Sequence, residues 1–254
     1  MMDNRRGFIA KLGLAMLAIP LSAGRARAQE NEMTTDGFTT KGSANLGGSF
    51  AVDPEWERDN QELIRSFVLP CHFGLDQARE VLKQDSRLVN ARFFDFDEAP
   101  IEAASHMGRT DIAQFLLGNG APYTVHCSVM MGHLEAARSF FDADAAQAVR
   151  PGAHTIPMMF HAAISGSIPM AELLEHYGGG QGYDWALCGA AGWHHPEMVD
   201  WMLGRGADPN YVSQKKTALD WSLQRGEHQA VLAILRKHGA KSAEELGLAG
   251  EAAQ

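Results

Sequence analysis

The chain has 254 residues, of which 45% are hydrophobic and 21% are charged, shares that are ordinary for a globular protein. Its 26 glycines and 10 prolines are too few for a collagen-like or low-complexity chain. The formal net charge of -9 argues against a nucleic-acid-binding protein, which usually carries a basic face. The composition therefore describes an acidic globular protein with room for one or two domains.

Residues 1–28 have the pattern of a cleaved export signal. A basic start that contains Arg5 and Arg6 precedes an apolar stretch at 12–23 and a small-residue site formed by Ala26 and Ala28. The apolar stretch is too short to cross a hydrocarbon core of about 30 Å comfortably. The arginine pair, followed by Gly-Phe-Ile, resembles the twin-arginine motif of bacteria. We predict cleavage after Ala28 and a periplasmic or extracellular location in a bacterium; the general secretory route and a retained anchor stay open as alternatives.

Cleavage would make the chain more acidic. It would reduce 22 basic and 31 acidic residues to 17 and 30, a net charge of −13. Residues 29–52 are polar and rich in Gly, Ser and Thr, and so cannot bury enough surface to offset the entropy of ordering. We predict a flexible tether over 29–52 and a disordered tail over 247–254, with membrane contact only through the signal before cleavage.

A repeat of about thirty residues organises the chain over 53–246. The segments 99–122, 187–210 and 217–240 each contain a turn, a short helical pattern, a tight turn, a longer helical pattern and a Gly-Ala loop. This pattern resembles the ankyrin repeat, whose period is about 33 residues. The tight turns are spaced by 34, 24, 34, 28 and 32 residues and fall at Gly74, Gly108, Gly132, Gly166, His194 and Gly226. The resemblance implies an all-α ankyrin-repeat solenoid of about six helix-turn-helix repeats, with the first and third degenerate, as a monomeric array.

Helical periodicity supports this register independently of the resemblance. Ile112, Phe115 and Leu116 lie on one stripe of the second helix of their repeat. A single helix pair cannot bury such a stripe, so neighbouring pairs must stack. Pro70 is predicted to shorten the first short helix, and the run 178–182, Gly-Gly-Gly-Gln-Gly, is predicted to be a flexible joint.

The three cysteines fall in the first, third and fifth repeats. Repeats stack about 8–10 Å apart, which separates Cys71, Cys127 and Cys188 by far more than the ~7 Å that a disulfide allows between Cα atoms. We therefore predict that they are small buried packing residues.

No motif for catalysis or metal binding is found. The chain has eleven histidines but no Cys-x-x-Cys or His-Glu-x-x-His pattern, no phosphate-binding glycine loop and no Gly-x-Ser-x-Gly nucleophile. We predict a non-enzymatic protein without catalytic residues, cofactor or metal.

The concave face remains as the candidate binding surface, because ankyrin arrays usually bind partners with their short helices and loop tips. Met and aromatic side chains are enriched at interface cores. The candidate partner-binding residues are His106, Met107, Met130, Met131, His161, Trp193 and Trp221. The resemblance implies protein–protein interaction with an unidentified protein partner and no nucleic acid. A copper or haem sensor, or another small-molecule sensor, using the same groove is the alternative function, and a purely space-filling role for these side chains also stays open.

Overall fold

The computed structural model describes residues 52–248, and this range contains thirteen α-helices, four short 3-10 helices and no strand. The predicted export signal with Arg5, Arg6, Ala26 and Ala28, nearly all of the predicted tether and the last residues of the tail lie outside the described residues. The α-helices are α2 Pro54–Asp59, α3 Gln61–Val68, α4 Leu75–Leu82, α5 Pro100–His106, α6 Thr110–Gly118, α7 Val125–Met130, α8 Leu134–Ala143, α9 Met158–Ser165, α10 Ile168–His176, α11 Tyr183–Gly192, α12 Pro196–Gly204, α13 Ala218–Gln224 and α14 Gln229–Lys237. The 3-10 helices are η3 Pro70–His72, η4 Ser86–Asn90, η5 Ala145–Val149 and η6 Ala153–Thr155.

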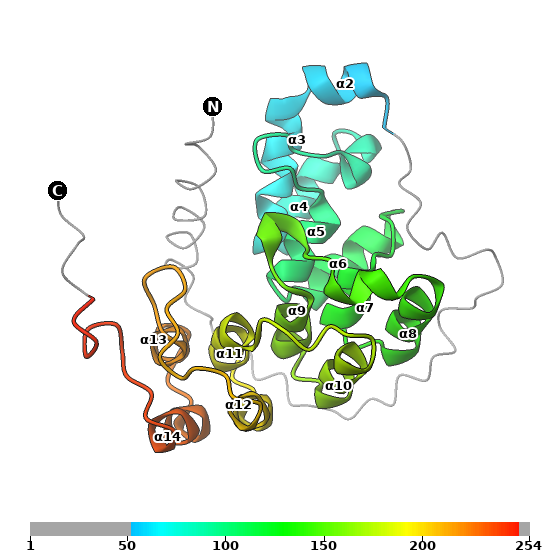
Figure 1. The fold of residues 1–254 in the computed structure, drawn as a ribbon. Helices are drawn as coiled ribbons and strands as arrows, with labels where there is room; N and C mark the ends of the chain where they lie inside the picture. Colours follow the sequence, from blue (N-terminus) through cyan, green and yellow to red (C-terminus); the bar gives the residue numbers. More distant parts are fainter. Residues whose placement is uncertain (1–51, 249–254) are drawn as a thin grey trace.

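The helices form six successive pairs, which we number one to six. Pair one consists of α3, η3 and α4, and pairs two to six are α5–α6, α7–α8, α9–α10, α11–α12 and α13–α14. The first helices form one layer, in which α5, α7, α9, α11 and α13 each contact the next. In the second layer α8 contacts α10, and α12 contacts α14. Figure 1 shows the pairs in a curved row from α3 and α4 to α13 and α14. The predicted all-α repeat solenoid is confirmed.

The tight turns lie where the glycine pattern predicts them. Five of the six turn residues adopt the left-handed conformation that glycine favours, with φ between 62° and 107°: Gly108, Gly132, Gly166, His194 and Gly226. The sixth, Gly74, has φ −121° and precedes the first residue of α4. Pro70 begins the three-residue helix η3, so the predicted shortening of the first helix at this proline is confirmed.

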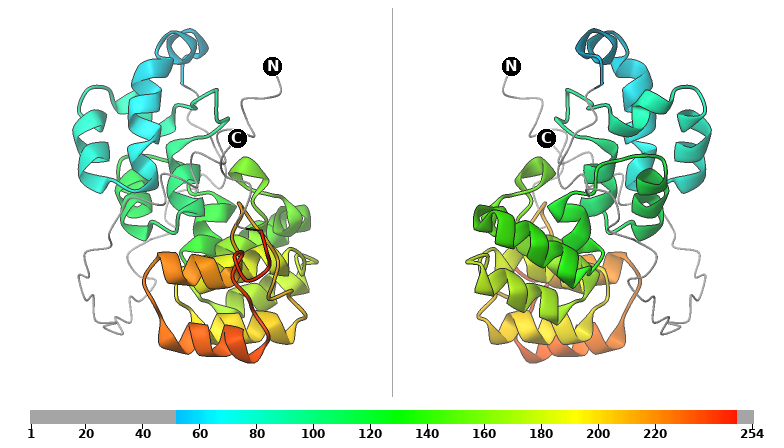
Figure 2. Two further views of the ribbon diagram at one scale, coloured as in Figure 1. Left: turned by 90° about the vertical axis from the view of Figure 1, so that its left-hand side faces the viewer. Right: turned by 90° about the vertical axis from the view of Figure 1, so that its right-hand side faces the viewer.

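Long and short loops alternate between the pairs, and this alternation bends the array sharply. The links at 83–99, 144–157 and 205–217 are long, whereas those at 119–124 and 177–182 are short. Across the short link and pair three, α5 contacts α9 as well as α7. The curvature also brings the indole of Trp193, in pair five, against the turn of pair two, where it leaves no space for a Cβ at Gly108. In both views of Figure 2, α3 runs in a different direction from α12 and α14.

The buried apolar side chains extend along the whole array and do not gather into one central core. Two buried clusters share it, one made mainly by pairs one and two and the other by pairs three to six. Cys71, Cys127 and Cys188 are all buried with free thiols, which confirms their prediction as packing residues. The predicted flexibility of 178–182 stays a prediction.

Candidate functional site

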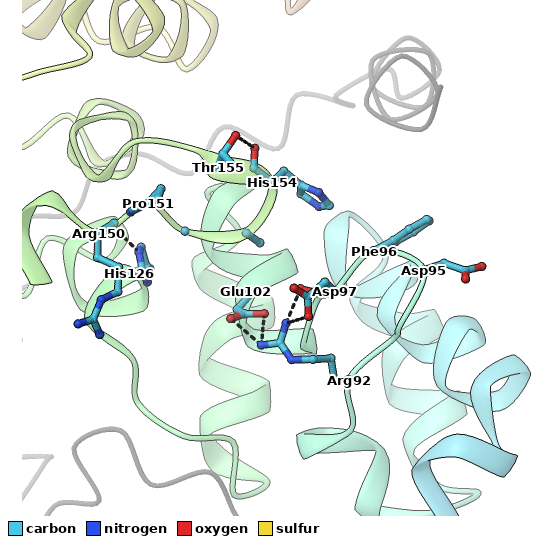
Figure 3. Close-up of a pocket in the computed structure, with 12 residues that line it drawn as sticks. Arg92, Asp95, Phe96, Asp97, Glu102, His126, Arg150, Pro151, His154 and Thr155 are labelled. Atoms are coloured by element: carbon cyan, nitrogen blue, oxygen red, sulfur yellow. Dashed lines mark hydrogen bonds and ion pairs between the residues drawn. The ribbon is translucent and has the colours of Figure 1, made fainter. Parts of the chain in front are cut away.

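A pocket of about 650 Å³ opens between two of the long loops. One wall is formed by Arg92 and residues 95–97, and the opposite wall by residues 150–155. Glu102 of α5 lies between these walls, and His126 of α7 lies beside Arg150 (Figure 3). The pocket follows from loop lengths: the short link 119–124 lies between the long loops 83–99 and 144–157 and leaves the space between them unfilled.

Charged groups on the first wall are paired with one another. Arg92 contacts Asp97 at 3.1 Å and Glu102 at 2.9 Å. Partial burial alone would lower the pKa of the Arg92 guanidinium, but the two carboxylates raise it, so Arg92 stays charged. Glu102 also accepts a hydrogen bond from the backbone N–H of Ala99, which caps α5. The first wall is therefore held in place by charge pairs and a helix cap.

The second wall is held by His126. Its Nε2 lies 3.2 Å from the carbonyl oxygen of Arg150, and its ring lies 5.2 Å from that of His161. Burial lowers the pKa of both imidazoles, so both rings are neutral at pH 7 and His126 Nε2 can donate its proton to the carbonyl.

The two loops that line the pocket also carry exposed apolar side chains. Phe94, which precedes Asp95, is 47% exposed, and Val149, which precedes Arg150, is 42% exposed. Within residues 52–248, only Leu223 and Leu248 are comparable large exposed hydrophobic residues. Two of these four side chains thus lie next in sequence to residues that line one pocket.

Behind the pocket wall lies a buried cluster of three histidines and one glutamate. Glu98 Oε2 is 3.2 Å from His72 Nε2, and Glu98 Oε1 is 3.1 Å from His106 Nδ1 and 3.2 Å from His154 Nε2. One ligand atom from each residue can be chosen so that all four lie within 4.8 Å of one another. These are the groups of the described residues that could together hold a metal ion.

Electrostatics keep Glu98 ionised in spite of its burial. Burial alone would raise its pKa, but His72 and His106 hold the pKa of the Glu98 carboxyl well below its usual range. Burial opposes the charged form of His72 as well, yet Glu98 raises the pKa of that imidazole. Burial lowers the pKa of His106 despite the same carboxylate. The cluster therefore centres on one buried negative charge.

The predicted groove residues are mostly inaccessible. Five are buried, namely His106, Met107, Met130, His161 and Trp221, while Met131 and Trp193 are partly buried. The cause is the tight curvature of the array, which closes the concave side. His106 of pair two and Trp221 of pair six line the same residual cavity of about 40 Å³. A cavity of that size has room for little more than a water molecule, so it cannot admit haem or a partner's side chain.

Sequence reasoning found only one member of the buried cluster, His106, and assigned it to the groove. His72, Glu98 and His154 come from three further segments that lie far apart in the chain, so no local motif links them. Glu102 and His106 are spaced so that both could lie on one face of α5 and bind one ion. The Glu102 carboxylate pairs with Arg92, however, and is not part of the cluster. The long loop 144–157, which carries His154 to the first two pairs, had no detectable sequence signal.

The repeated unit defines an all-α repeat solenoid: a first helix, a turn residue that is left-handed in five of the six pairs, a second helix and a loop that leads to the next pair. No family model matches the chain, and no curated protein matches it. Among solved structures, the human ASB11 ankyrin repeat domain is similar to it, with 18% sequence identity and a TM-score of 0.40 over 75% of this chain and 93% of that one.

Proposed function

We propose that this chain is an exported, non-enzymatic repeat protein that binds another protein through the loop face around the 650 Å³ pocket. The observation that carries the proposal is that Phe94 and Val149 are exposed on the two loops whose neighbouring residues, Asp95 and Arg150, line opposite walls of that pocket. At protein interfaces a few anchor side chains and the pockets beside them carry most of the binding energy. The concave side holds a cavity of about 40 Å³, whereas this larger pocket lies between the long loops.

The pocket also favours one kind of partner surface. Asp95, Asp97 and Glu102 line it together with Arg92 and Arg150, which leaves one formal negative charge in excess, and the whole chain is acidic. A partner loop that inserts an apolar side chain and carries Lys or Arg beside it would complement both features, because complementary charge steers association and fixes register.

The cysteine thiols give no support to an enzymatic function. Burial raises the pKa of Cys127 to about 12 and also raises the pKa of Cys71 and Cys188. Thiols in such surroundings are poor nucleophiles, because the thiolate is the reactive form. A binding function does not require any of these thiols to be ionised.

Substituting Phe94 and Val149 tests the partner surface. The partner would be identified by cross-linking to the wild-type protein in the exporting cell, and its affinity measured with purified proteins. The double variant Phe94→Ser, Val149→Ser should weaken binding at least ~10-fold, because it removes two apolar side chains that a partner on this face would bury. Leu223→Ser is the matched control, since Leu223 is 41% exposed on α13, away from the pocket-lining loops. Equal affinity of the double variant and the control would refute the proposed surface.

Export through the twin-arginine route is proposed from the sequence of residues 1–28 alone. The helices of the described range include none that is long and apolar enough to cross a membrane. The double variant Arg5→Lys, Arg6→Lys keeps the charge but removes the paired guanidinium groups, and should abolish export, with the precursor accumulating in the cytoplasm. Lys11→Arg serves as a charge-matched control. Cell fractionation provides the measurement, and unchanged export of the double variant would assign the general secretory route.

A further inference from the structure

We propose that His72, Glu98, His106 and His154 bind one divalent transition-metal ion, and that Zn²⁺ fits this site best. Nothing in the proposed partner surface requires this ion, so the two proposals stand independently. Three features of the cluster support it: the geometry of the four side chains, the hydrogen bonds they make and fail to make, and the backbone that presents them.

The spacing of the ligand atoms is close to that of a tetrahedral site. Zn²⁺ binds imidazole nitrogen and carboxylate oxygen at about 2.0–2.2 Å, which places neighbouring ligands of a tetrahedron about 3.3–3.6 Å apart. Glu98 Oε1 lies 3.1 Å from His106 and 3.2 Å from His154, and Glu98 Oε2 lies 3.2 Å from His72. The set as a whole extends to 4.8 Å, so a small inward rotation of side chains would enclose one ion.

The hydrogen bonds of His72 fix which of its nitrogens faces Glu98. His72 Nδ1 lies 3.0 Å from the carbonyl oxygen of Val68, and a carbonyl can only accept. Nδ1 therefore carries a proton, and Nε2 is the nitrogen that faces the Glu98 carboxylate. The two must share a cation, either a proton or a metal ion, because two bare acceptors this close together repel each other. An imidazole whose outer nitrogen donates to a backbone carbonyl is also the usual arrangement of a metal-binding histidine.

A proton shared between His72 and Glu98 would serve that pair alone, whereas four side chains converge here. His72 Nε2, His106 Nδ1 and both oxygens of Glu98 are buried and, apart from the contacts among these side chains, have no hydrogen-bond partner. Buried polar atoms of folded proteins are almost always satisfied, and each exception requires an explanation. Here the unsatisfied atoms converge on one point from separate segments, as the ligands of a single ion would.

The two loops that supply Glu98 and His154 have strained backbones. Asp97, which precedes Glu98, has φ 51°, and His154 and Thr155 have φ 57° and 61°. Residues other than glycine pay roughly 1 kcal/mol or more for this conformation, and such strain clusters at binding sites. The bond from Gly152 N–H to the Ile156 carbonyl, 2.8 Å long, holds the second loop in this shape. Both loops are thereby bent toward the same buried point.

The donor set selects the kind of ion. Three imidazoles and one carboxylate suit Zn²⁺ and other divalent first-row metals, whereas Ca²⁺ and Mg²⁺ prefer oxygen ligands alone and Cu(I) prefers sulfur. His154 is the most exposed ligand, with 11% of its side chain accessible, and it also lines the 650 Å³ pocket. The ion would therefore enter through that pocket.

Metal loading of the purified full chain tests the proposal. After treatment with a chelator, one equivalent of Zn²⁺ would be added, free metal removed by gel filtration, and bound metal measured by mass spectrometry together with the melting temperature. The wild-type protein should retain about one Zn²⁺ per chain and melt at a higher temperature with Zn²⁺ than without it, because an ion that binds only the folded state stabilises it. Co²⁺ in place of Zn²⁺ should give the intense visible absorption of a tetrahedral site.

Three variants separate metal binding from folding. Glu98→Gln and His154→Asn should each lose retained metal and the metal-dependent rise in melting temperature; asparagine tolerates the left-handed conformation of residue 154. His161→Gln removes an equally buried histidine outside the cluster and should keep both signals. If circular dichroism shows that Glu98→Gln does not fold, the metal retention of His154→Asn decides whether the site binds Zn²⁺. Failure of the wild-type protein to retain Zn²⁺, or retention by His154→Asn equal to that of the wild type, would overturn the proposal.

Discussion

Replacing Trp221 by alanine is expected to lower the free energy of unfolding by about 3–5 kcal/mol, the usual cost of truncating a buried tryptophan. Trp221 is only 6% exposed, although it lies on a first helix that an open ankyrin groove would present to solvent. Its ring is covered by the Lys216 ammonium at 4.6 Å and borders the cavity shared with His106 and Trp193. Its removal would enlarge a space that the rigid helices cannot collapse to fill.

Trp201→Ala is the matched control for this experiment. Trp201 lies on the second helix α12, is partly exposed and is covered by Arg205 at 4.4 Å. Because it gives up less buried area, its loss should cost about 1–2 kcal/mol. Urea unfolding followed by circular dichroism measures both values. A smaller loss for Trp221→Ala than for Trp201→Ala would show that the concave side is open in solution and would restore Trp221 as a surface residue.

The repeat architecture could be predicted because its determinants are local. A glycine or another residue that tolerates positive φ recurs at the turns, and an apolar triplet such as Ile112, Phe115 and Leu116 recurs on several of the second helices. Both signals therefore show a visible period. Pro70 could be interpreted in the same way, since its effect on a helix depends only on its own ring.

The shape of the concave side could not be predicted in this way. Whether Trp193 reaches the turn at Gly108 depends on the sum of small rotations over three pairs and on the short link 119–124. The shortened spacing between Gly108 and Gly132 was visible in the sequence, but its effect on curvature acts between pairs that are distant in the chain. Five of the seven residues assigned to an open groove are therefore buried, and Met131 and Trp193 are partly buried.

The buried cluster was missed for a related reason. Sequence motifs detect ligands that share a helix or a loop, whereas His72, Glu98 and His154 meet only after pairs one and two have packed and the loop 144–157 has folded over them. The turn spacing gave no indication of it, because the loops 83–99 and 144–157 fall within spacings of 34 residues, close to the ankyrin period. These two long loops supply Glu98 and His154, and they also form the walls of the pocket.

Replacing Gly179 by alanine is expected to lower the free energy of unfolding by about 1–3 kcal/mol, the usual cost of overpacking. Gly179 belongs to the segment 178–182, which its glycine content predicts to be a flexible joint. In the structure its backbone N–H donates to the Leu174 carbonyl at 2.7 Å. An added Cβ would lie 2.6 Å from the backbone oxygen of Ala148, an atom that cannot move aside as a side chain can.

Gly204→Ala provides the opposite expectation in the same fold. Gly204 ends the helix α12, and an added Cβ there meets nothing within 4 Å. Alanine should therefore raise the free energy of unfolding by up to about 1 kcal/mol, because it reduces the entropy of the unfolded chain. Urea unfolding of both variants gives the comparison. If Gly179→Ala leaves the free energy of unfolding as high as Gly204→Ala does, the segment 178–182 is a flexible joint that can move to make room for the Cβ. If Gly179→Ala lowers that free energy, the segment is fixed against Ala148 and holds η5, and with it the second wall of the pocket.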